Sequence, residues 1–294
     1  MSGRDGGDSR SGPPARGGSG RDQELPAFSR RLHGWFMAYV RPYLRRHFHA
    51  VRLLRADPGA ADHPAIAGEP AFFYSNHPGW WDPLTFLFVG ERLYPGRMIY
   101  GPIDARALGK YRFLERIGFL GIEPGTWRGA ARFLRMAKAA GRRSDVIFWT
   151  TSQGEFADPR ERPVRLRPGV GHAVAAAAGG VIAPLAVEYP FWNERLPEVL
   201  VAFGPAIRIA EAPGRPADEW TAVLERALEE TQDRLAAAAR RRDPRAFRTL
   251  LTGRVGVGGV YDVCRRIGAW LRGERFVASH GGERLEPPAP EPPA

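Results

Sequence analysis

The sequence has almost no cysteine: Cys264 is the single one in 294 residues. One thiol cannot form an internal disulfide, so we expect a reducing compartment, and zinc sites built from several cysteines are excluded. Seven histidines are scattered along the chain without an H-E-x-x-H pattern, so we expect no metal and no redox cofactor. The G-x-S-x-G pattern of serine hydrolases is also missing, which argues against that enzyme class.

Long apolar runs are missing as well. The nearest approach is the Ala-rich stretch 173–189, which is interrupted by Gly179, Gly180 and Pro184. A membrane-spanning helix needs about 20 consecutive apolar residues, so we expect none. The first residues lack the apolar core of a signal peptide, and their Gly, Ser and Arg content predicts a disordered arm over 1–24.

Acidic residues are outnumbered by basic ones, which gives a formal net charge of +11 and an isoelectric point near 10.5. Such a chain prefers anionic partners: nucleic acid, an acidic bilayer surface or a phosphorylated substrate. No helix-turn-helix, zinc-finger or RNA-recognition signature accompanies the charge. We therefore expect no nucleic-acid partner, although a basic nucleic-acid-binding protein stays as an alternative.

Strand-like and helix-like segments alternate through the middle of the chain, which predicts an α/β fold with a mixed sheet covered by helices. We expect one domain over 25–275, with a core at 70–210, C-terminal helices within 216–273 and a Pro-rich tail at 276–294. The expected strands are 71–75, 97–101, 118–122, 145–151, 180–189 and 199–209. The expected helices are 83–94, 104–116, 126–140, 216–242 and a second basic one at 260–273.

Residues 28–54 carry aromatic side chains at helical spacing with arginines between them. The pattern predicts amphipathic N-terminal helices, kinked or divided at Pro42. Such helices suit the interface of an anionic bilayer, but a helix packed on the protein core with a solvated basic face fits the pattern equally well.

The stretch "FFYSNHPGWWDP" (72–83) places polar residues directly after a strand-like run. In open α/β sheets, ligands gather at the carboxyl ends of strands. His77 and Asp82 are separated by a tight Pro-Gly turn, so the carboxylate can reach the imidazole and fix its tautomer. Asp82 followed by Pro83 also fits a plain helix start, which would leave His77 as an ordinary loop histidine.

The block "NHPGWWDPL" resembles the H-x(4)-D signature of the glycerolipid acyltransferases, the family of bacterial 1-acylglycerol-3-phosphate acyltransferase, and further blocks follow in order over about 70–210. The resemblance implies an acyltransferase-type fold and transfer of a fatty acyl chain from acyl-CoA or acyl carrier protein to the hydroxyl of a lysophospholipid or lipid-like alcohol. It implies His77 as general base, Asp82 as the residue that orients it, and Asn76 and Trp81 as substrate contacts. No cofactor beyond the acyl donor is implied.

The second block departs from the family pattern. In "GFLGIEPGTWRG" (118–129), Glu123 and Pro124 stand where the family has Asp-Arg, so the arginine expected to bind the acceptor phosphate is missing. Arg128, five residues after Glu123, is the candidate replacement; a plain surface arginine is the alternative.

The third block, "FWTTSQGEF" (148–156), keeps the family's glycine as Gly154, with Gln153 and Glu155 in place of the usual Glu and Thr. We expect these three residues to contact substrate. Arginines crowd the following loop and should repel one another unless an anion joins them. They are Arg160, Arg162, Arg165 and Arg167, of which Arg160 and Arg167 are the predicted substrate contacts.

The resemblance implies an acyltransferase, and the single cysteine, the missing signal peptide and the basic amphipathic stretches predict that it is held peripherally on the cytoplasmic, inner face of the cell membrane. The departures in the second and third blocks both affect recognition of an acceptor phosphate, so the identity of the acceptor alcohol is left open. A catalytically degenerate, lipid-binding relative of the family is the main alternative.

Overall fold

The structure of the chain is a computed structural model that describes residues 25–66 and 68–254. The arm predicted over 1–24, the helix predicted over 260–273 and the tail predicted over 276–294 lie outside these ranges. No helix within the described ranges is both long and apolar enough to cross a bilayer.

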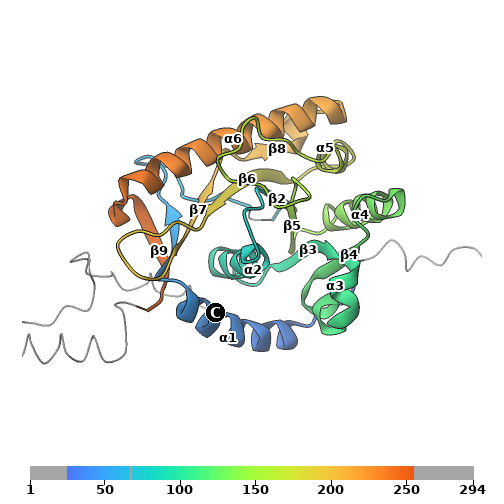
Figure 1. Cartoon of the computed structure of the whole chain (residues 1–294). Coiled ribbons are helices and arrows are strands. Elements are labelled where there is room, and N and C mark those ends of the chain that lie inside the picture. Colours follow the sequence, from blue (N-terminus) through green and yellow to red (C-terminus); the bar gives the residue numbers. More distant parts are fainter. Residues whose placement is uncertain (1–24, 67, 255–294) are drawn as a thin grey trace, which may run out of the picture.

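One mixed sheet organises the described chain, and most of its pairings are parallel (Figure 1). The order is β4-β3-β5-β2-β6-β7-β1-β9, with β8 paired to β6 off this path. Strands β4, β3, β5, β2 and β6 are parallel neighbours, and the β6–β7 and β1–β9 pairs are antiparallel. The strands are β1 (Ala50–Leu54), β2 (Ala71–Ser75), β3 (Met98–Asp104), β4 (Phe119–Ile122), β5 (Val146–Thr151), β6 (Val181–Glu188), β7 (Glu198–Phe203), β8 (Ile207–Arg208) and β9 (Phe247–Thr252).

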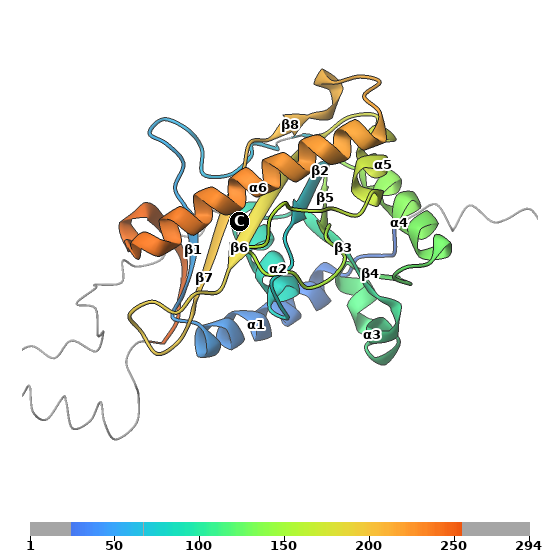
Figure 2. The ribbon, with the colours of Figure 1, turned by 45° about the horizontal axis from the view of Figure 1, so that its top comes forward.

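Helices cover both faces of this sheet, so the predicted α/β class is confirmed (Figures 1 and 2). α1 and α2 pack on one face, and α4, α5 and α6 pack on the other. The short α3 and the 3-10 turn η2 join β3 to β4. The helices are α1 (Arg30–His47), α2 (Asp82–Leu93), α3 (Ala105–Lys110), η2 (Arg112–Ile117), α4 (Trp127–Ala140), α5 (Gly169–Ala175), η3 (Ile209–Glu211), α6 (Ala217–Arg241) and η4 (Pro244–Ala246).

Strand β2 lies in the middle of the sheet, as its continuous apolar sequence predicts. All five of its residues are buried. Successive side chains of a strand point to opposite faces, so Phe73 joins the cluster under α1 and α2, whereas Phe72 and Tyr74 join the cluster under α4, α5 and α6. This doubly covered strand fixes the position of the loop that follows it.

The N-terminal segment differs from the prediction of helices over 28–54. α1 ends at His47, and residues 50–54 form β1, which pairs with β7 and β9 inside the sheet. The helix also continues through Pro42 without a break. Pro42 is exposed, as is Ala38, whose carbonyl loses its helical partner, so water can compensate for the missing hydrogen bond.

Three other predicted segments are divided or changed. The helix predicted over 104–116 is split at Tyr111 into α3 and η2, and the strand predicted over 199–209 is interrupted after Phe203. The C-terminal region predicted as helices contains β9, which pairs with β1 at the edge of the sheet. A six-residue strand stabilised by a partner about 200 residues away leaves no strong local pattern.

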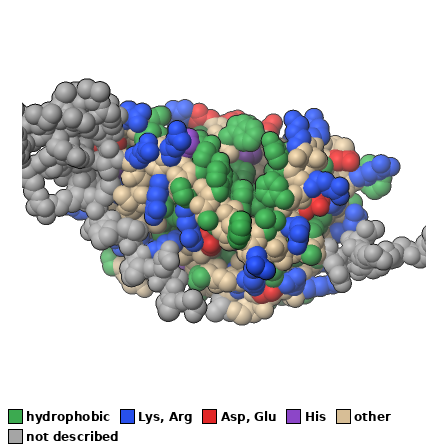
Figure 3. Space-filling view, turned by 90° about the horizontal axis from the view of Figure 1, so that it is seen from below, with side chains coloured by type: hydrophobic (Ala, Val, Ile, Leu, Met, Phe, Trp, Pro, Cys, Tyr) green, Lys and Arg blue, Asp and Glu red, His purple; other side chains and the backbone are tan. Residues whose placement is uncertain are grey.

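The outer face of α1 carries exposed aromatic side chains. Met37, Val40 and Leu44 point inward and are buried. Trp35 and Tyr39 lie on the outside with exposed fractions of 80% and 59%. Figure 3 shows hydrophobic side chains gathered across the middle of this face, with Lys and Arg side chains around them. Both alternatives for α1 are thus compatible with the structure, since one side packs on the core and another stays open.

Gly118 is a position where the fold requires glycine. It has a φ of 104°, and an added Cβ would lie 1.9 Å from the Ile99 carbonyl oxygen. We expect Gly118→Ala to lower the free energy of unfolding by about 2–4 kcal/mol, because strained backbone and overpacking both act there. Chemical denaturation measures this. The control Gly109→Ala, a helical position with no atom within 4 Å, should leave stability unchanged or raise it by up to about 1 kcal/mol. Equal effects of the two substitutions would contradict the argument.

Candidate active site

The polar residues singled out in the sequence gather at one edge of the sheet. Because β4, β3, β5, β2 and β6 are parallel, their carboxyl ends lie along the same edge. His77 comes two residues after β2, Gln153 two residues after β5, and Tyr189 directly after β6. Neighbouring strands therefore deliver these three residues to one place, where open α/β sheets bind ligands.

His77 and Asp82 are in contact. The His77 Nδ1 atom lies 2.5 Å from Asp82 Oδ2. Asp82 is completely buried, whereas the His77 side chain is 19% exposed. Asp82 opens α2, but no side chain caps this helix, so the alternative of Asp82 as a plain cap is not what the structure has. With Nδ1 engaged by the carboxylate, Nε2 is the ring nitrogen left to exchange a proton with a ligand.

Tyr189 is a further partner of Asp82. Its hydroxyl donates to Asp82 Oδ1 over 2.5 Å, and the Thr85 hydroxyl lies 3.3 Å from the same phenol oxygen. Burial raises the pKa of Tyr189 well above its ordinary value, and the adjacent Asp82 charge raises it further. Tyr189 therefore stays protonated and acts as a donor. The Gly79 backbone N–H adds a bond of 3.2 Å to Asp82 Oδ2.

The backbone around His77 is held from both neighbouring strands. The Asn76 side chain is completely buried and bonds in both directions with the Val187 backbone of β6, each bond being 2.9 Å long. Gln153 Oε1 accepts the His77 backbone N–H over 2.9 Å, and the His77 carbonyl accepts the Ala157 N–H over 3.1 Å. Asn76 and Gln153, both predicted as substrate contacts, thus position the loop that carries His77.

Aromatic side chains flank the pair. Trp81, a predicted substrate contact, is partly buried against the end of α1, where its ring lies 4.8 Å from Phe48 and 5.2 Å from His47. Phe156, in the loop after β5, lies 4.5 Å from the His77 ring and is 59% exposed. Trp80 is 85% exposed. The His77 ring is thus bordered by the apolar Phe156 side chain.

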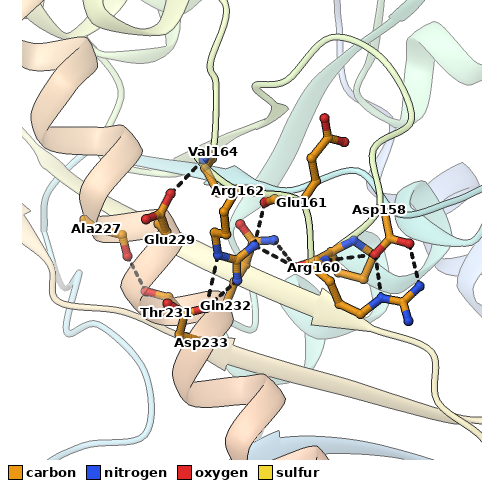
Figure 4. Close-up of polar contacts among 11 residues, drawn as sticks. Asp158, Arg160, Glu161, Arg162, Val164, Ala227, Glu229, Thr231, Gln232 and Asp233 are labelled. Atoms are coloured by element: carbon orange, nitrogen blue, oxygen red, sulfur yellow. Dashed lines mark hydrogen bonds and ion pairs between the residues drawn. The ribbon is translucent and has the colours of Figure 1, made fainter.

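The arginine-rich loop after β5 is paired with acidic residues of the protein itself (Figure 4). Arg160 bonds to Asp158, Arg162 reaches Asp233 of α6, and Arg165 lies 3.6 Å from Glu225 of the same helix. The prediction that these arginines need an external anion is therefore wrong for these three.

The same face of α6 also binds the backbone of this loop. Glu229 accepts the Val164 N–H over 2.7 Å, and Glu225 accepts the Leu166 N–H over 2.9 Å (Figure 4 shows the Glu229 contact). Gln232 donates to the Pro159 carbonyl. Because Glu225, Glu229 and Asp233 are spaced by four residues, they lie on one face of α6 and fasten the loop along its length.

Gly154, Glu155 and Arg167 lie at the exposed start and end of this loop. Gly154 has a φ of 74°, and the Arg167 side chain packs directly over it. The Arg167 Nε atom lies 3.4 Å from the Gln153 carbonyl oxygen, so Arg167 is the predicted arginine that the structure brings near the His77 loop. Among the described residues, Arg167 has no carboxylate partner.

Arg128 is not brought to the pair. It lies in the first turn of α4, which follows β4, and three strand spacings separate β4 from β2. At about 4.8 Å per spacing, the two carboxyl ends are roughly 14 Å apart.

Tyr189 is the site residue that sequence reasoning missed. Its one available signal was its place at the carboxyl end of the strand predicted over 180–189, next to the strand that leads to His77.

A scan against protein-family models and a search of the curated proteins each found no match to this chain. No group of three or more His, Cys, Asp or Glu side chains in 25–66 and 68–254 is arranged to hold a metal ion. The geometry of the site therefore carries the functional argument.

Tyr189→Phe tests the support of Asp82. Removing the hydroxyl leaves Asp82 Oδ1 buried without this donor, so we expect the free energy of unfolding to fall by about 1–3 kcal/mol. Urea denaturation measures the change. Tyr39→Phe removes the same atom from an exposed ring and should change stability by less than about 0.5 kcal/mol. If both variants behave alike, the Tyr189–Asp82 bond is not stabilising.

Proposed function

We propose that the protein is an acyltransferase of the glycerolipid acyltransferase type, with the corresponding fold. It transfers an acyl chain from a thioester, acyl-CoA or acyl carrier protein, to the hydroxyl of a lysophospholipid or lipid-like alcohol. The observation that carries the proposal is the 2.5 Å contact between His77 Nδ1 and a fully buried Asp82, which directs Nε2 to the open side. The resemblance of the block at 76–84 to the family signature supports it.

His77 acts as general base in this mechanism. Nε2 takes the proton of the acceptor hydroxyl while the oxygen attacks the thioester carbonyl, and Asp82 stabilises the positive charge that forms on the ring. When the tetrahedral intermediate collapses, the carbon–sulfur bond breaks and the departing sulfur receives the proton from Nε2. The products are the acyl ester and a free thiol, and His77 returns to its starting state.

The hydrogen bonds that hold His77 and Asp82 in place suit a general base. A histidine base works only if its proton-accepting nitrogen points at the substrate, and contributes about 10²–10⁴-fold when it does. Tyr189 and Gly79 fix the Asp82 carboxylate, and Gln153 fixes the His77 backbone. Phe156 and the exposed Trp80 give the apolar border that a lipid substrate prefers.

The outer face of α1 supports a membrane partner. Trp35 and Tyr39 are exposed, and Phe113 of η2, which packs near Phe36 with its ring tilted, has 42% of its surface open. Exposed arginines lie on the same elements: Arg31, Arg45, Arg46, Arg112 and Arg116. Aromatic side chains among cations suit the interface of an anionic bilayer. We therefore place the protein peripherally on the inner face of the cell membrane, where its acceptor lipid resides.

The catalytic proposal is tested by acceptor-dependent thiol release. With acyl-CoA or acyl carrier protein and a panel of lysophospholipids and glycolipids, we expect His77→Ala to lower kcat/KM by about 10²–10⁴-fold. The matched control His172→Ala alters an exposed histidine of α5 and should keep full activity. Acceptor-dependent release that is indifferent to His77 would show that the mechanism is wrong, and a folded wild type without any release would favour the degenerate, lipid-binding alternative.

The membrane proposal is tested by co-sedimentation with phosphatidylcholine vesicles that contain or lack phosphatidylglycerol. We expect binding to depend on phosphatidylglycerol and to fall at least about tenfold in the double variant Trp35→Ala, Tyr39→Ala, because two interfacial anchors are removed. Trp127→Ala removes an equally open indole from a helix on the opposite face of the sheet and should bind as the wild type does. Loss in both variants would contradict a specific role for the α1 face.

A further inference from the structure

A hollow lies at the same edge of the sheet, beside α4. Its volume is about 290 Å³. Ala105 and Glu123, which directly follow β3 and β4, line one side, and the first turns of α4 line the other. The hollow thus opens along the edge that also carries His77.

Three arginines of α4 line the hollow: Arg128, Arg132 and Arg135. Their spacing places them on one face of the helix. Within 25–66 and 68–254, none of the three has an ion pair, in contrast to Arg160, Arg162 and Arg165 of the loop after β5. Glu123 supplies the one acidic side chain of the lining. The hollow therefore keeps a local excess of positive charge, which favours a ligand with several negative charges.

An exposed indole stands at the same place. Trp127 lines the hollow and is 76% exposed, and the Arg128 guanidinium lies 5.7 Å from its ring centre. A free indole face is a stacking platform for a nucleobase, and stacking contributes about 1–3 kcal/mol per base. Arginines beside such a platform suit the phosphates of a nucleotide.

Contacts within the protein hold the wall of the hollow in place before any ligand binds. The Thr126 hydroxyl donates to the Glu123 carbonyl and accepts the Gly129 N–H, each over 3.0 Å. A Cβ at Gly129 would lie 2.0 Å from the Glu123 carbonyl oxygen, so glycine lets α4 approach the end of β4 this closely. Trp127 and Arg128 are therefore presented from a fixed helix start.

The distance between the hollow and His77 limits which class of ligand can occupy the hollow while it reacts at His77. The hollow lies three strand spacings, roughly 14 Å, from the strand that leads to His77. The phosphate of a lysophospholipid is only a few bonds from the attacking hydroxyl, so it cannot occupy the hollow while that hydroxyl is at Nε2. A phosphopantetheine arm can cover this distance, because it places its thioester far from its phosphates.

We propose that this hollow binds the 3′-phosphoadenosine diphosphate end of coenzyme A, with the pantetheine arm running along the sheet edge to His77. Trp127 stacks on the adenine, and Arg128, Arg132 and Arg135 bind the phosphates. The inference rests on the proposed function and assigns acyl-CoA, rather than a carrier protein, as the donor.

Binding of CoA to the full chain is measured first, by titration calorimetry on the His77→Ala protein, so that turnover plays no part. We expect Arg132→Ala and Arg135→Ala each to weaken CoA binding about tenfold, as loss of a charge-assisted hydrogen bond does. Arg142→Ala removes the same charge from an exposed position just after α4 and should bind CoA unchanged. Dephospho-CoA, which lacks the 3′-phosphate, should bind more weakly than CoA to the unaltered hollow. Circular dichroism confirms that each variant is folded.

Kinetics then separate this inference from the proposed function. With otherwise wild-type protein, Arg132→Ala should raise KM for acyl-CoA about tenfold and leave kcat/KM for acyl-pantetheine, which lacks the nucleotide, unchanged. Three results would each overturn the nucleotide assignment. The first is an equal loss of activity with acyl-CoA and acyl-pantetheine, and the second is CoA binding that does not change in Arg132→Ala and Arg135→Ala. The third is effective use of an acyl carrier protein that these substitutions abolish. If CoA binds as described but no acyl transfer occurs, the hollow is a CoA site and the proposed function fails.

Discussion

The buried carboxylate of Asp82 is the constraint around which the site is built. Removing an ionised carboxylate from water costs several kcal/mol, and hydrogen bonds to a charged group return about 1.5–3 kcal/mol each. Asp82 is satisfied by three donors, from His77, Gly79 and Tyr189, which come from the loop after β2 and from the end of β6. Each donor that is missing leaves the buried carboxylate less well compensated, so the contact with Asp82 also fixes the orientation of the His77 ring.

Two groups of arginines in the described part of the chain differ in whether carboxylates of the protein pair with them. The loop after β5 uses its arginines and backbone N–H groups to attach to the carboxylates of α6. α4 carries three arginines, Arg128, Arg132 and Arg135, that have no carboxylate partner in the described part of the chain. Two clusters that look alike in composition therefore differ in electrostatic character, because one faces an acidic helix and the other faces a hollow.

Sequence reasoning identified the parts of the site that local patterns encode. The apolar run of β2, the turn between His77 and Asp82 and the start of α2 are all contiguous, so the strand and the His77–Asp82 pair could be predicted. Tyr189 could not, because it reaches Asp82 from 107 residues away. The same holds for Arg162, whose partner Asp233 is 71 residues distant, and for β9, which pairs with β1. Such pairings depend on strand order, which propensity and periodicity do not contain.

The chain order of these contacts determines when the site can exist. His77 and Asp82 are synthesised early, whereas Tyr189 and the acidic face of α6 are synthesised more than a hundred residues later. A growing polypeptide that has just emerged from the ribosome holds the imidazole and its neighbouring carboxylate without the groups that immobilise them. The His77–Asp82 pair therefore gains its full set of hydrogen-bond donors only after β6 has joined the sheet, and a nascent chain that ends before Tyr189 lacks one of them.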